Sequence, residues 1–431
     1  MRSLFLIFFV VTTSTSFAVD ELLFKQKINH LDPLSQAFDQ RYFVDKSFAQ
    51  NDLAPIVLQL CGEGECSLYV SENSLQTQIA MQAKAEIIAL EHRYYGKSQP
   101  FSNLENTSLQ YLTVEQAILD IQALQKSIDP QNQRKWFVIG SSYAGTLAAI
   151  YRQRFPNLTV GALSSSAPVR AEFSFVSYDK FTSDSLGPQC SQKVRDLIME
   201  IEFRLLQDKS IQEYKSVFKV PHIQNDLNFL FLISEFTTAF VQFGYAADFC
   251  QGVENIGALQ AIAYYVNAFY ADGQGLDLST WGFETLSNTK IENSSSISRQ
   301  WWSQVCREMG FFQVANPDRQ NSVRSAVFNE QFFQNICKEN YGIESTQIDE
   351  FNKKYFKPLR DGQYSRIIFT MGTEDPWSML SVMSDDRVTS GQDSLLIDIE
   401  GGSHSSELYS QTGVMDDFQR KIIARAVQWL L

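Results

Sequence analysis

The stretch from Phe137 to Ala149 reads FVIGSSYAGTLAA and decides the fold prediction for this chain. Its apolar start predicts the end of a buried strand, and its last residues favour a helix. A nucleophile on a strained strand-to-helix turn needs small residues on both sides, because bulk would block the turn and the substrate. Ser142 has Gly140 and Ala144 two positions away on either side. The stretch therefore indicates a nucleophile elbow, with a helix-capping serine on a glycine turn as the alternative.

Ser141 is the competing nucleophile in this stretch. Two positions away on either side of it stand Ile139 and Tyr143, and both are too bulky for an elbow. A strict elbow would also have glycine at position 144, where this chain has the next smallest residue. Ser142 is therefore the candidate that we carry forward.

Strand-like and helix-like segments alternate around this elbow and return near the end of the chain. Such alternation predicts βαβ units and a parallel sheet. The predicted strands are Ile56 to Leu60, Ile87 to Leu90, Phe137 to Ile139, Val160 to Leu163, Arg366 to Thr370 and Leu395 to Ile399. The predicted helices are Thr77 to Ala85, Val114 to Ser127 and Asp416 to Leu430.

The middle of the chain has a different pattern. From about Phe173 to Tyr341, apolar residues recur at helical spacing, which predicts a helical insertion in an α/β core. The expected organisation is an α/β-hydrolase core with a mostly parallel sheet and an inserted helical cap. Its expected parts are a signal peptide over 1–18, core over 19–171, cap over 172–345 and core over 346–431.

A serine hydroxyl needs a base to take its proton and an acid to orient that base. The chain has four histidines: His30, His92, His222 and His404. His404 stands in a small-residue loop, Glu400 to Ser406, after the last predicted strand, where an imidazole can reach over the sheet edge. We therefore take His404 as the candidate base.

Asp375 follows the strand that is predicted to end at Thr370, and it precedes His404 by one strand. The order serine, acid, histidine is that of α/β-hydrolases. Glu374 is the alternate acid, and Asp375-Pro376 is also an ordinary turn signal. The joint order of the three residues is a stronger indication than any one of them.

Preorganised donors must also meet the negative oxygen of the transition state. The backbone N–H of Tyr143 is the first candidate, because it follows the nucleophile. The second candidate is an N–H of Gly62, Glu63 or Gly64, directly after the first predicted strand of the core. The bland alternative is a plain turn closed by Cys61 and Cys66.

Composition limits the class of protein. The net charge of −13 argues against nucleic acid as a partner. Arg2, an apolar run over Leu4 to Val11 and small residues at Ser16 and Ala18 predict a cleaved secretory signal, and no later stretch is apolar enough to cross a membrane. The expected destination is outside the cell or in a lysosomal or vacuolar lumen.

That compartment predicts that the six cysteines form disulfides, although the sequence does not choose among the pairings. No CxxC or histidine-rich cluster is present, so neither a metal nor another cofactor is expected. Three glycosylation sequons, at Asn106, Asn157 and Asn293, agree with secretion.

Several motifs together resemble the prolyl carboxypeptidase family of serine peptidases, over nearly the whole mature chain. The motifs are Glu91-His92-Arg93-Tyr94-Tyr95-Gly96-Lys97-Ser98, Gly140-Ser141-Ser142-Tyr143-Ala144-Gly145, Ser165-Ser166-Ala167-Pro168-Val169, Asp375-Pro376-Trp377 and Ser403-His404. Within that family the elbow and the Ser-Ser-Ala-Pro-Val segment look most like thymus-specific serine protease.

The resemblance implies a Ser-Asp-His triad at Ser142, Asp375 and His404, a capped α/β-hydrolase core and cleavage after proline. It places Trp377 at the proline-binding wall, and it places the segment from Trp301 to Phe312, with Trp302 and Phe311, at a cap that closes the pocket. Cap core around Cys306 is an equal alternative for that segment. The implied disulfide is Cys306–Cys337, which leaves Cys190–Cys250 and Cys61–Cys66.

The chain departs from the family pattern in three places. Ser141 replaces a glycine before the nucleophile, Glu407 stands where aspartate is more usual, and Cys61 and Cys66 flank the oxyanion loop. The prediction is a secreted or lysosomal exopeptidase of the Pro-X carboxypeptidase or dipeptidyl peptidase type, acting on peptides. An esterase or lipase and a non-catalytic binding protein are the alternatives, a homodimer is left open, and Glu63 is a candidate acceptor for a substrate amino terminus.

Overall fold

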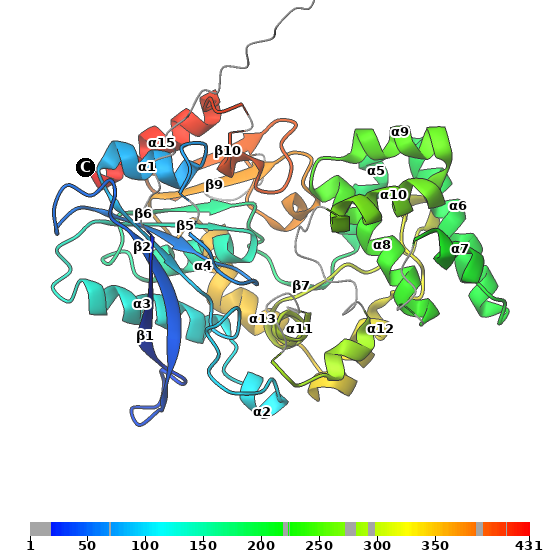
Figure 1. Ribbon diagram of the computed structural model, residues 1–431, viewed down its shortest axis with the longest axis horizontal. Coiled ribbons are helices and arrows are strands. Elements are labelled where there is room, and N and C mark those ends of the chain that lie inside the picture. Colours follow the sequence, from blue (N-terminus) through cyan, green and yellow to red (C-terminus); the bar gives the residue numbers. More distant parts are fainter. Residues whose placement is uncertain are drawn as a thin grey trace, which may run out of the picture.

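The computed structural model describes residues 19–68, 70–218, 223, 225–271, 282–291, 298–384, 391–410 and 412–431. The predicted signal segment, His222 and Asn293 therefore lie outside the described residues. Figure 1 shows two parts side by side, a sheet flanked by helices and a mainly helical part. The sheet part contains both the first and the last residues that the structure describes.

The core is an eight-stranded sheet with the strand order β1-β2-β4-β3-β5-β6-β9-β10. The strands β1 and β2 pair antiparallel, as do β2 and β4, and every other neighbouring pair is parallel. The bounds are β1 Val19–Lys27, β2 Ala37–Asp45, β3 Ile56–Leu60, β4 Glu86–Leu90, β5 Trp136–Ser141, β6 Gly161–Ser165, β9 Ile367–Gly372 and β10 Leu395–Ile399.

The central strands are apolar on both faces because helices cover both faces of the sheet. The helices α1 (Leu75–Ala83) and α15 (Asp417–Leu430) pack together on one face. The helices α3 (Val114–Ile128) and α4 (Ser142–Arg154) cover the other face, as Figure 1 shows below the sheet. All six predicted strands and three predicted helices are present, with ends shifted by a few residues at most.

The predicted strands include neither β1 nor β2 of this sheet. The strand β1 gives the weaker signal of the two. Its residues alternate poorly, and most of them are exposed, because it is an edge strand held by a hairpin partner. An edge strand that buries little apolar surface carries no clear period-two pattern.

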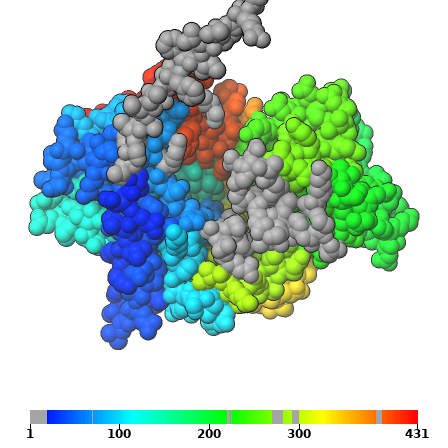
Figure 2. All heavy atoms as spheres, in the orientation of Figure 1, coloured from blue at the N-terminus to red at the C-terminus, as the bar shows by residue number. Residues whose placement is uncertain are grey.

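The insertion between β6 and β9 contains the cap, coloured green to yellow in Figures 1 and 2. The predicted helical pattern is confirmed there, with one small addition: a two-stranded parallel sheet of β7 and β8. The bounds are β7 Glu172–Ser174, α5 Val176–Ser185, α6 Gly187–Leu206, α7 Gln212–Val217, α8 Asp226–Gln242, α9 Ala246–Ile256, α10 Ala258–Ala271, η2 Phe283–Ser287, α11 Ser298–Gln304, η3 Val305–Met309, β8 Gly310–Phe312, η4 Arg319–Asn321 and α12 Glu330–Tyr341.

Shorter elements connect and complete the core. They are α2 Asn106–Leu109, α13 Ile348–Phe351, η5 Asn352–Phe356, α14 Lys357–Arg360, η6 Pro376–Leu380 and η7 Ser406–Leu408. None of the helices that the structure describes combines the length and the apolar character that crossing a membrane requires.

Three disulfides link the six cysteines: the resemblance implied one of them, Cys306–Cys337, and the other two are the expected pairs of the remaining cysteines. They are Cys61–Cys66, Cys190–Cys250 and Cys306–Cys337. The second lies within the cap and joins α6 to α9, and the third joins η3 to α12. The first closes the short loop directly after β3.

Candidate active site

The turn from β5 into α4 has the geometry of a nucleophile elbow. Ser142 adopts a left-handed backbone conformation with φ 54°, while Ser141 before it is extended. A residue other than glycine costs about 1–3 kcal/mol in this region, and such residues cluster at functional sites. A Cβ on Gly140 would lie 2.1 Å from the carbonyl oxygen of Ala144, so only glycine fits there.

The sheet brings the three candidate triad residues to one edge. The residues Ser141, Ser165, Thr370 and Ile397 are register partners across β5, β6, β9 and β10. Ser142, Asp375 and His404 follow β5, β9 and β10, so all three lie beyond the carboxyl ends of parallel strands. This edge is where α/β proteins bind their ligands.

Asp375 and His404 are in direct contact. The Nδ1 atom of His404 lies 2.7 Å from Oδ2 of Asp375, and the carboxylate is fully buried. The other carboxylate oxygen of Asp375 accepts a hydrogen bond from the backbone N–H of Trp377 at 3.0 Å. Burial alone lowers the pKa of His404, but the charge and hydrogen bond of Asp375 outweigh it and raise that pKa above its ordinary value.

Ser142 has no hydrogen bond to His404 among the residues that the structure describes. Catalytic hydrogen bonds are often long or poorly aligned before substrate is bound. The alternate acid Glu374 is exposed on the loop after β9 and makes no contact with the His404 ring. Another histidine, His30, pairs with Asp120 of α3 at 2.7 Å, which is a structural role.

Residues of both the core and the cap hold the loop that carries His404. The backbone N–H of His404 donates to the carbonyl of Gln242, the last residue of α8 in the cap, at 2.9 Å. The next residue, Ser405, donates its N–H to the hydroxyl of Ser166 at 2.8 Å. The ring of Phe243 also stands edge-on to the imidazole. The cap therefore helps to position the candidate base.

The predicted oxyanion loop lies against the elbow. A Cβ built on Gly62 would stand 3.9 Å from the Cβ of Ala144 in the first turn of α4. The first N–H groups of a helix have no partner within the helix, so the Tyr143 N–H is free of an intrahelical bond. Burial raises the pKa of Glu63 to about 7, against the opposing charge of His404.

The side chain of Tyr143 is held by a buried network that sequence reasoning missed. Its hydroxyl lies 3.1 Å from Nε2 of His92 and accepts a hydrogen bond from the Gln304 amide at 2.8 Å. The carbonyl of the Gln304 side chain accepts from the hydroxyl of Tyr95 at 2.6 Å. Gln304 belongs to the cap, so this network ties α11 to the residue after the candidate nucleophile. No local pattern in the sequence marks Gln304.

The buried imidazole of His92 predicts a pH effect on stability. Its Nδ1 lies 2.7 Å from the Arg93 carbonyl, and burial lowers its pKa from 6.5 to about 4. Below pH 6.5 the unfolded chain therefore binds a proton that the folded chain refuses, so this group lowers the free energy of unfolding as the pH falls towards 4. The expected loss is about 3 kcal/mol for the whole interval.

Urea unfolding at pH 7 and pH 4.5 measures this effect when wild type is compared with His92→Gln. Glu63 and Glu308 have pKa values raised to about 7 and act in the opposite direction over the same interval. The comparison therefore isolates His92: the variant should lose less stability on acidification than wild type. Equal losses in the two proteins would contradict the prediction.

The motif around Glu91 has a structural role. The fully buried Glu91 carboxylate binds the Arg41 guanidinium, the hydroxyl of Ser98 and the backbone N–H of Cys66. The bond to Cys66 fixes the far end of the disulfide loop that carries Gly62. Arg41 and Glu91 are thus further residues that support the oxyanion loop and that sequence reasoning did not assign.

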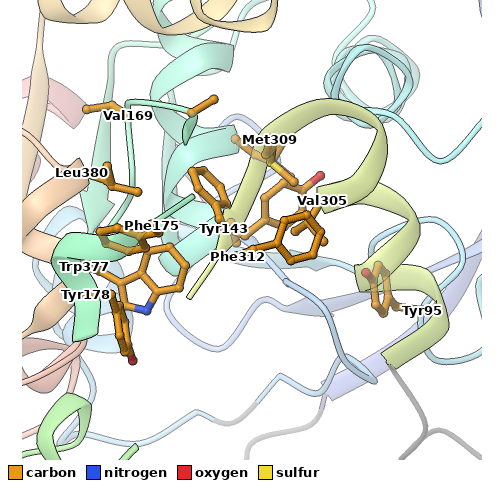
Figure 3. Close-up of a cluster of buried hydrophobic side chains, with 14 of the residues drawn as sticks. Tyr95, Tyr143, Val169, Phe175, Tyr178, Val305, Met309, Phe312, Trp377 and Leu380 are labelled. Atoms are coloured by element: carbon orange, nitrogen blue, oxygen red, sulfur yellow. The ribbon is translucent and has the colours of Figure 1, made fainter. Parts of the chain in front are cut away.

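Trp377 lies in an aromatic cluster where core and cap meet. Figure 3 shows it grouped with Phe175 and Tyr178, while Tyr143 lies beside Val305, Met309 and Phe312 of the cap. Its indole N–H donates to the side-chain carbonyl of Gln242 at 3.0 Å, and Phe311 packs edge-on against its ring at 5.5 Å.

The other predicted substrate-binding residues lie in two different parts of the molecule. Trp302 and Phe311 both line a cavity of about 260 Å³ in the cap, whereas Glu63 lies in the loop after β3. Cys306 in the same segment is fully buried. The segment from Trp301 to Phe312 therefore supplies both cap core and cavity wall.

Glu407, one of the three departures from the family pattern, also lies near the candidate site. It is fully buried, one oxygen accepts from the hydroxyl of Thr370, and its charge contributes to the raised pKa of His404. Asn106 and Asn157 of the predicted sequons are exposed. Within the described ranges, no group of histidine, cysteine, aspartate and glutamate side chains is arranged to hold a metal ion.

The sheet order, the strained elbow and the inserted cap define the chain as an α/β-hydrolase. Residues 26–417 match the family model described as Serine carboxypeptidase S28, and the chain belongs to that family of serine peptidases. The resemblance seen in the sequence is thereby confirmed at the level of the family.

Three relatives show how far the similarity extends. "Probable serine protease EDA2" of Arabidopsis thaliana is 31% identical over 90% of this chain and 81% of its own. The mouse lysosomal Pro-X carboxypeptidase is 27% identical over 90% of this chain and 83% of its own. The human thymus-specific serine protease is 26% identical over 88% of this chain and 80% of its own.

Proposed function

We propose that this chain is a serine exopeptidase that cleaves peptides after proline through a Ser142-Asp375-His404 acyl-enzyme mechanism. The observation that carries the proposal is the 2.7 Å contact between His404 and Asp375, at the sheet edge that also bears the elbow of Ser142. Membership of a serine peptidase family supports the same reaction class.

The three proposed catalytic residues would act in two steps, which are acylation of Ser142 and hydrolysis of the acyl-enzyme. The Ser142 hydroxyl attacks the scissile carbonyl while Nε2 of His404 takes its proton, and Asp375 stabilises the imidazolium. The backbone N–H groups of Tyr143 and of Gly62 or Glu63 hold the oxyanion. His404 then gives the proton to the leaving amine. Water attacks the acyl-enzyme with the same histidine as base and releases Ser142.

Two observations support proline as the preferred residue. The indole of Trp377 stands near the triad, since its own N–H and that of His404 both bind Gln242, and a flat apolar ring is a suitable wall for a pyrrolidine. One relative is named a Pro-X carboxypeptidase. The esterase alternative is less favoured because Glu63 stands in the oxyanion loop, where lipases and esterases have an HGGG-type motif. The non-catalytic alternative is less favoured because all three triad residues are present.

The compartment is part of the proposal. The disulfides and the two exposed sequons fit a protein that is secreted or held in a lysosomal lumen. One curated relative is named lysosomal.

Two matched peptides with one internal proline test the exopeptidase proposal at acidic and at neutral pH. One peptide is blocked at its amino end and the other at its carboxyl end, and Ser142→Ala is the control. We expect cleavage after proline of one peptide but not of the other, since an exopeptidase requires one free end. Cleavage of both peptides or at other residues would contradict the exopeptidase or the proline assignment. No cleavage, with a fluorophosphonate failing to label Ser142, would favour the non-catalytic alternative.

A further inference from the structure

The cap contains an open cavity of about 260 Å³ to which the chemical steps of the proposed reaction assign no role. Its walls are mainly aromatic, and they include Phe231, Phe283, Trp301 and Trp302. Its polar lining includes Glu235 of α8 together with Gln313 and Arg324. An apolar pocket with a few convergent polar groups is the usual form of a ligand site.

Two aromatic residues connect this cavity to the candidate active site. Trp301 lines the cavity and also packs edge-on against Tyr143, with ring centroids 5.7 Å apart. Phe311 lines the cavity and packs against Trp377. A single side chain therefore separates the cavity from Tyr143, which follows the candidate nucleophile, and another separates it from Trp377, which lies near the candidate acid.

The helix α8 gives the distance between the cavity and the candidate active site. Gln242, which binds Trp377 and the backbone of His404, lies seven residues after Glu235. Residues seven apart share one helix face and are about 10 Å apart along the axis. An extended peptide covers about 3.3–3.6 Å per residue, so a substrate group two or three residues from the scissile bond can reach this cavity.

Of the two charged side chains that line the cavity, the negative one is the more exposed. The side chain of Arg324 is fully enclosed and pairs with Glu235, while the Glu235 side chain keeps 26% of its surface exposed. Arg324 also donates to Gln313 at 3.2 Å and lies close to Thr238. Because Glu235 is the more exposed of the two, a ligand in the cavity can reach the carboxylate more readily than the guanidinium.

We propose that this cavity is a subsite for an ammonium group of the peptide substrate, with Glu235 as its acceptor and the aromatic rings as its walls. The ammonium group comes either from a free amino terminus or from a lysine side chain near the scissile bond. Aromatic faces attract cations, and a carboxylate forms charge-assisted hydrogen bonds with them. This inference rests on the proposed peptidase function and adds the substrate class that the site prefers.

Three peptides with the same proline and leaving group test the proposal. One has a free amino terminus, one is acetylated, and one is acetylated with lysine two residues before the scissile bond. We expect wild type to prefer at least one ammonium-bearing peptide over the acetylated one by about 10- to 100-fold in kcat/KM, the size of a hydrogen bond to a charged group. The peptide that is preferred identifies the source of the ammonium group.

Glu235→Gln should abolish that preference, and Glu254→Gln is the matched control. Glu254 is an exposed acid on α9 of the same cap and does not line the cavity, so the preference should persist in its variant. Loss of the preference in Glu63→Gln but not in Glu235→Gln would overturn the proposal in favour of the loop after β3.

A second variant guards against a folding defect, since Glu235→Gln leaves the buried Arg324 without its ion pair. The double variant Glu235→Leu with Arg324→Met removes both charges, and such replacements of a buried pair are often neutral or stabilising. It should fold, and it should show no preference for an ammonium-bearing peptide over the acetylated one.

The two proposals fail in different ways. Cleavage by wild type without any preference for an ammonium group, or a preference that persists in the double variant, overturns the subsite alone. Absence of cleavage of all three peptides by folded wild type overturns the proposed function, and with it the subsite that depends on it.

Discussion

Ser142→Ala is expected to lower kcat by about 10⁴- to 10⁶-fold while the protein stays folded. The loss is large because the residues of a triad act as a unit, and Ser142 is the residue of this turn that has the left-handed backbone. The backbone of Ser142 has φ 54°, and alanine in its place carries the same Cβ, so the turn itself should persist. Steady-state kinetics on a proline peptide, together with labelling by a fluorophosphonate, measures the effect.

Ser141→Ala is the matched control for this prediction. Ser141 lies next to Ser142 but has an extended backbone and makes no side-chain cap on α4. It should therefore keep most of the activity and the fluorophosphonate label. A variant of Ser142 that keeps wild-type activity, or a variant of Ser141 that loses all of it, would show that the nucleophile has been assigned to the wrong serine.

Asp375→Asn is expected to lower kcat by about 10⁴-fold. The buried carboxylate accepts from Nδ1 of His404 and from the N–H of Trp377. Asparagine can keep the bond to Trp377 through its carbonyl, but its amide then offers a donor to Nδ1 and favours the wrong tautomer of the imidazole. The pKa of His404 should also fall, because Asp375 is the main group that raises it against burial.

The pH dependence of kcat/KM separates this effect from a general loss of structure. The pKa of His404 governs the acidic limb, since only the neutral imidazole can take the proton from Ser142. In Asp375→Asn that limb should move to lower pH, whereas Glu374→Gln should leave both kcat and the limb unchanged. An unchanged limb in Asp375→Asn would count against its proposed role.

The cap connects these predictions because it contacts the proposed machinery at two points. Gln242 holds the backbone of His404 and the indole of Trp377, and Gln304 holds the hydroxyl of Tyr143. The proposed base and the residue that supplies an oxyanion N–H are both fixed by residues of the insertion. The proposed ammonium subsite lies on the same helix face as Gln242. The insertion thus positions the proposed catalytic residues and also contains the proposed subsite for substrate specificity.

The local sequence determined the central strands, the elbow and the order of the candidate triad residues. Those features depend on the period of apolar residues and on small residues at fixed offsets, which neighbouring residues carry along the chain. Membership of the family also followed from short motifs, and the disulfide that the resemblance implied, Cys306–Cys337, is present.

Other features were decided only by the tertiary structure. The edge strand β1 is set by its partner β2, because its own residues bury little apolar surface. The network of Tyr143 and Gln304 joins residues far apart in the sequence, and so does the pair of Glu235 and Arg324. The local sequence does not reveal such a contact, because the contact forms only when folding brings the two side chains within hydrogen-bond distance. The sequence therefore specified where chemistry could occur, and the packing of the cap on the core decided which side chains surround it.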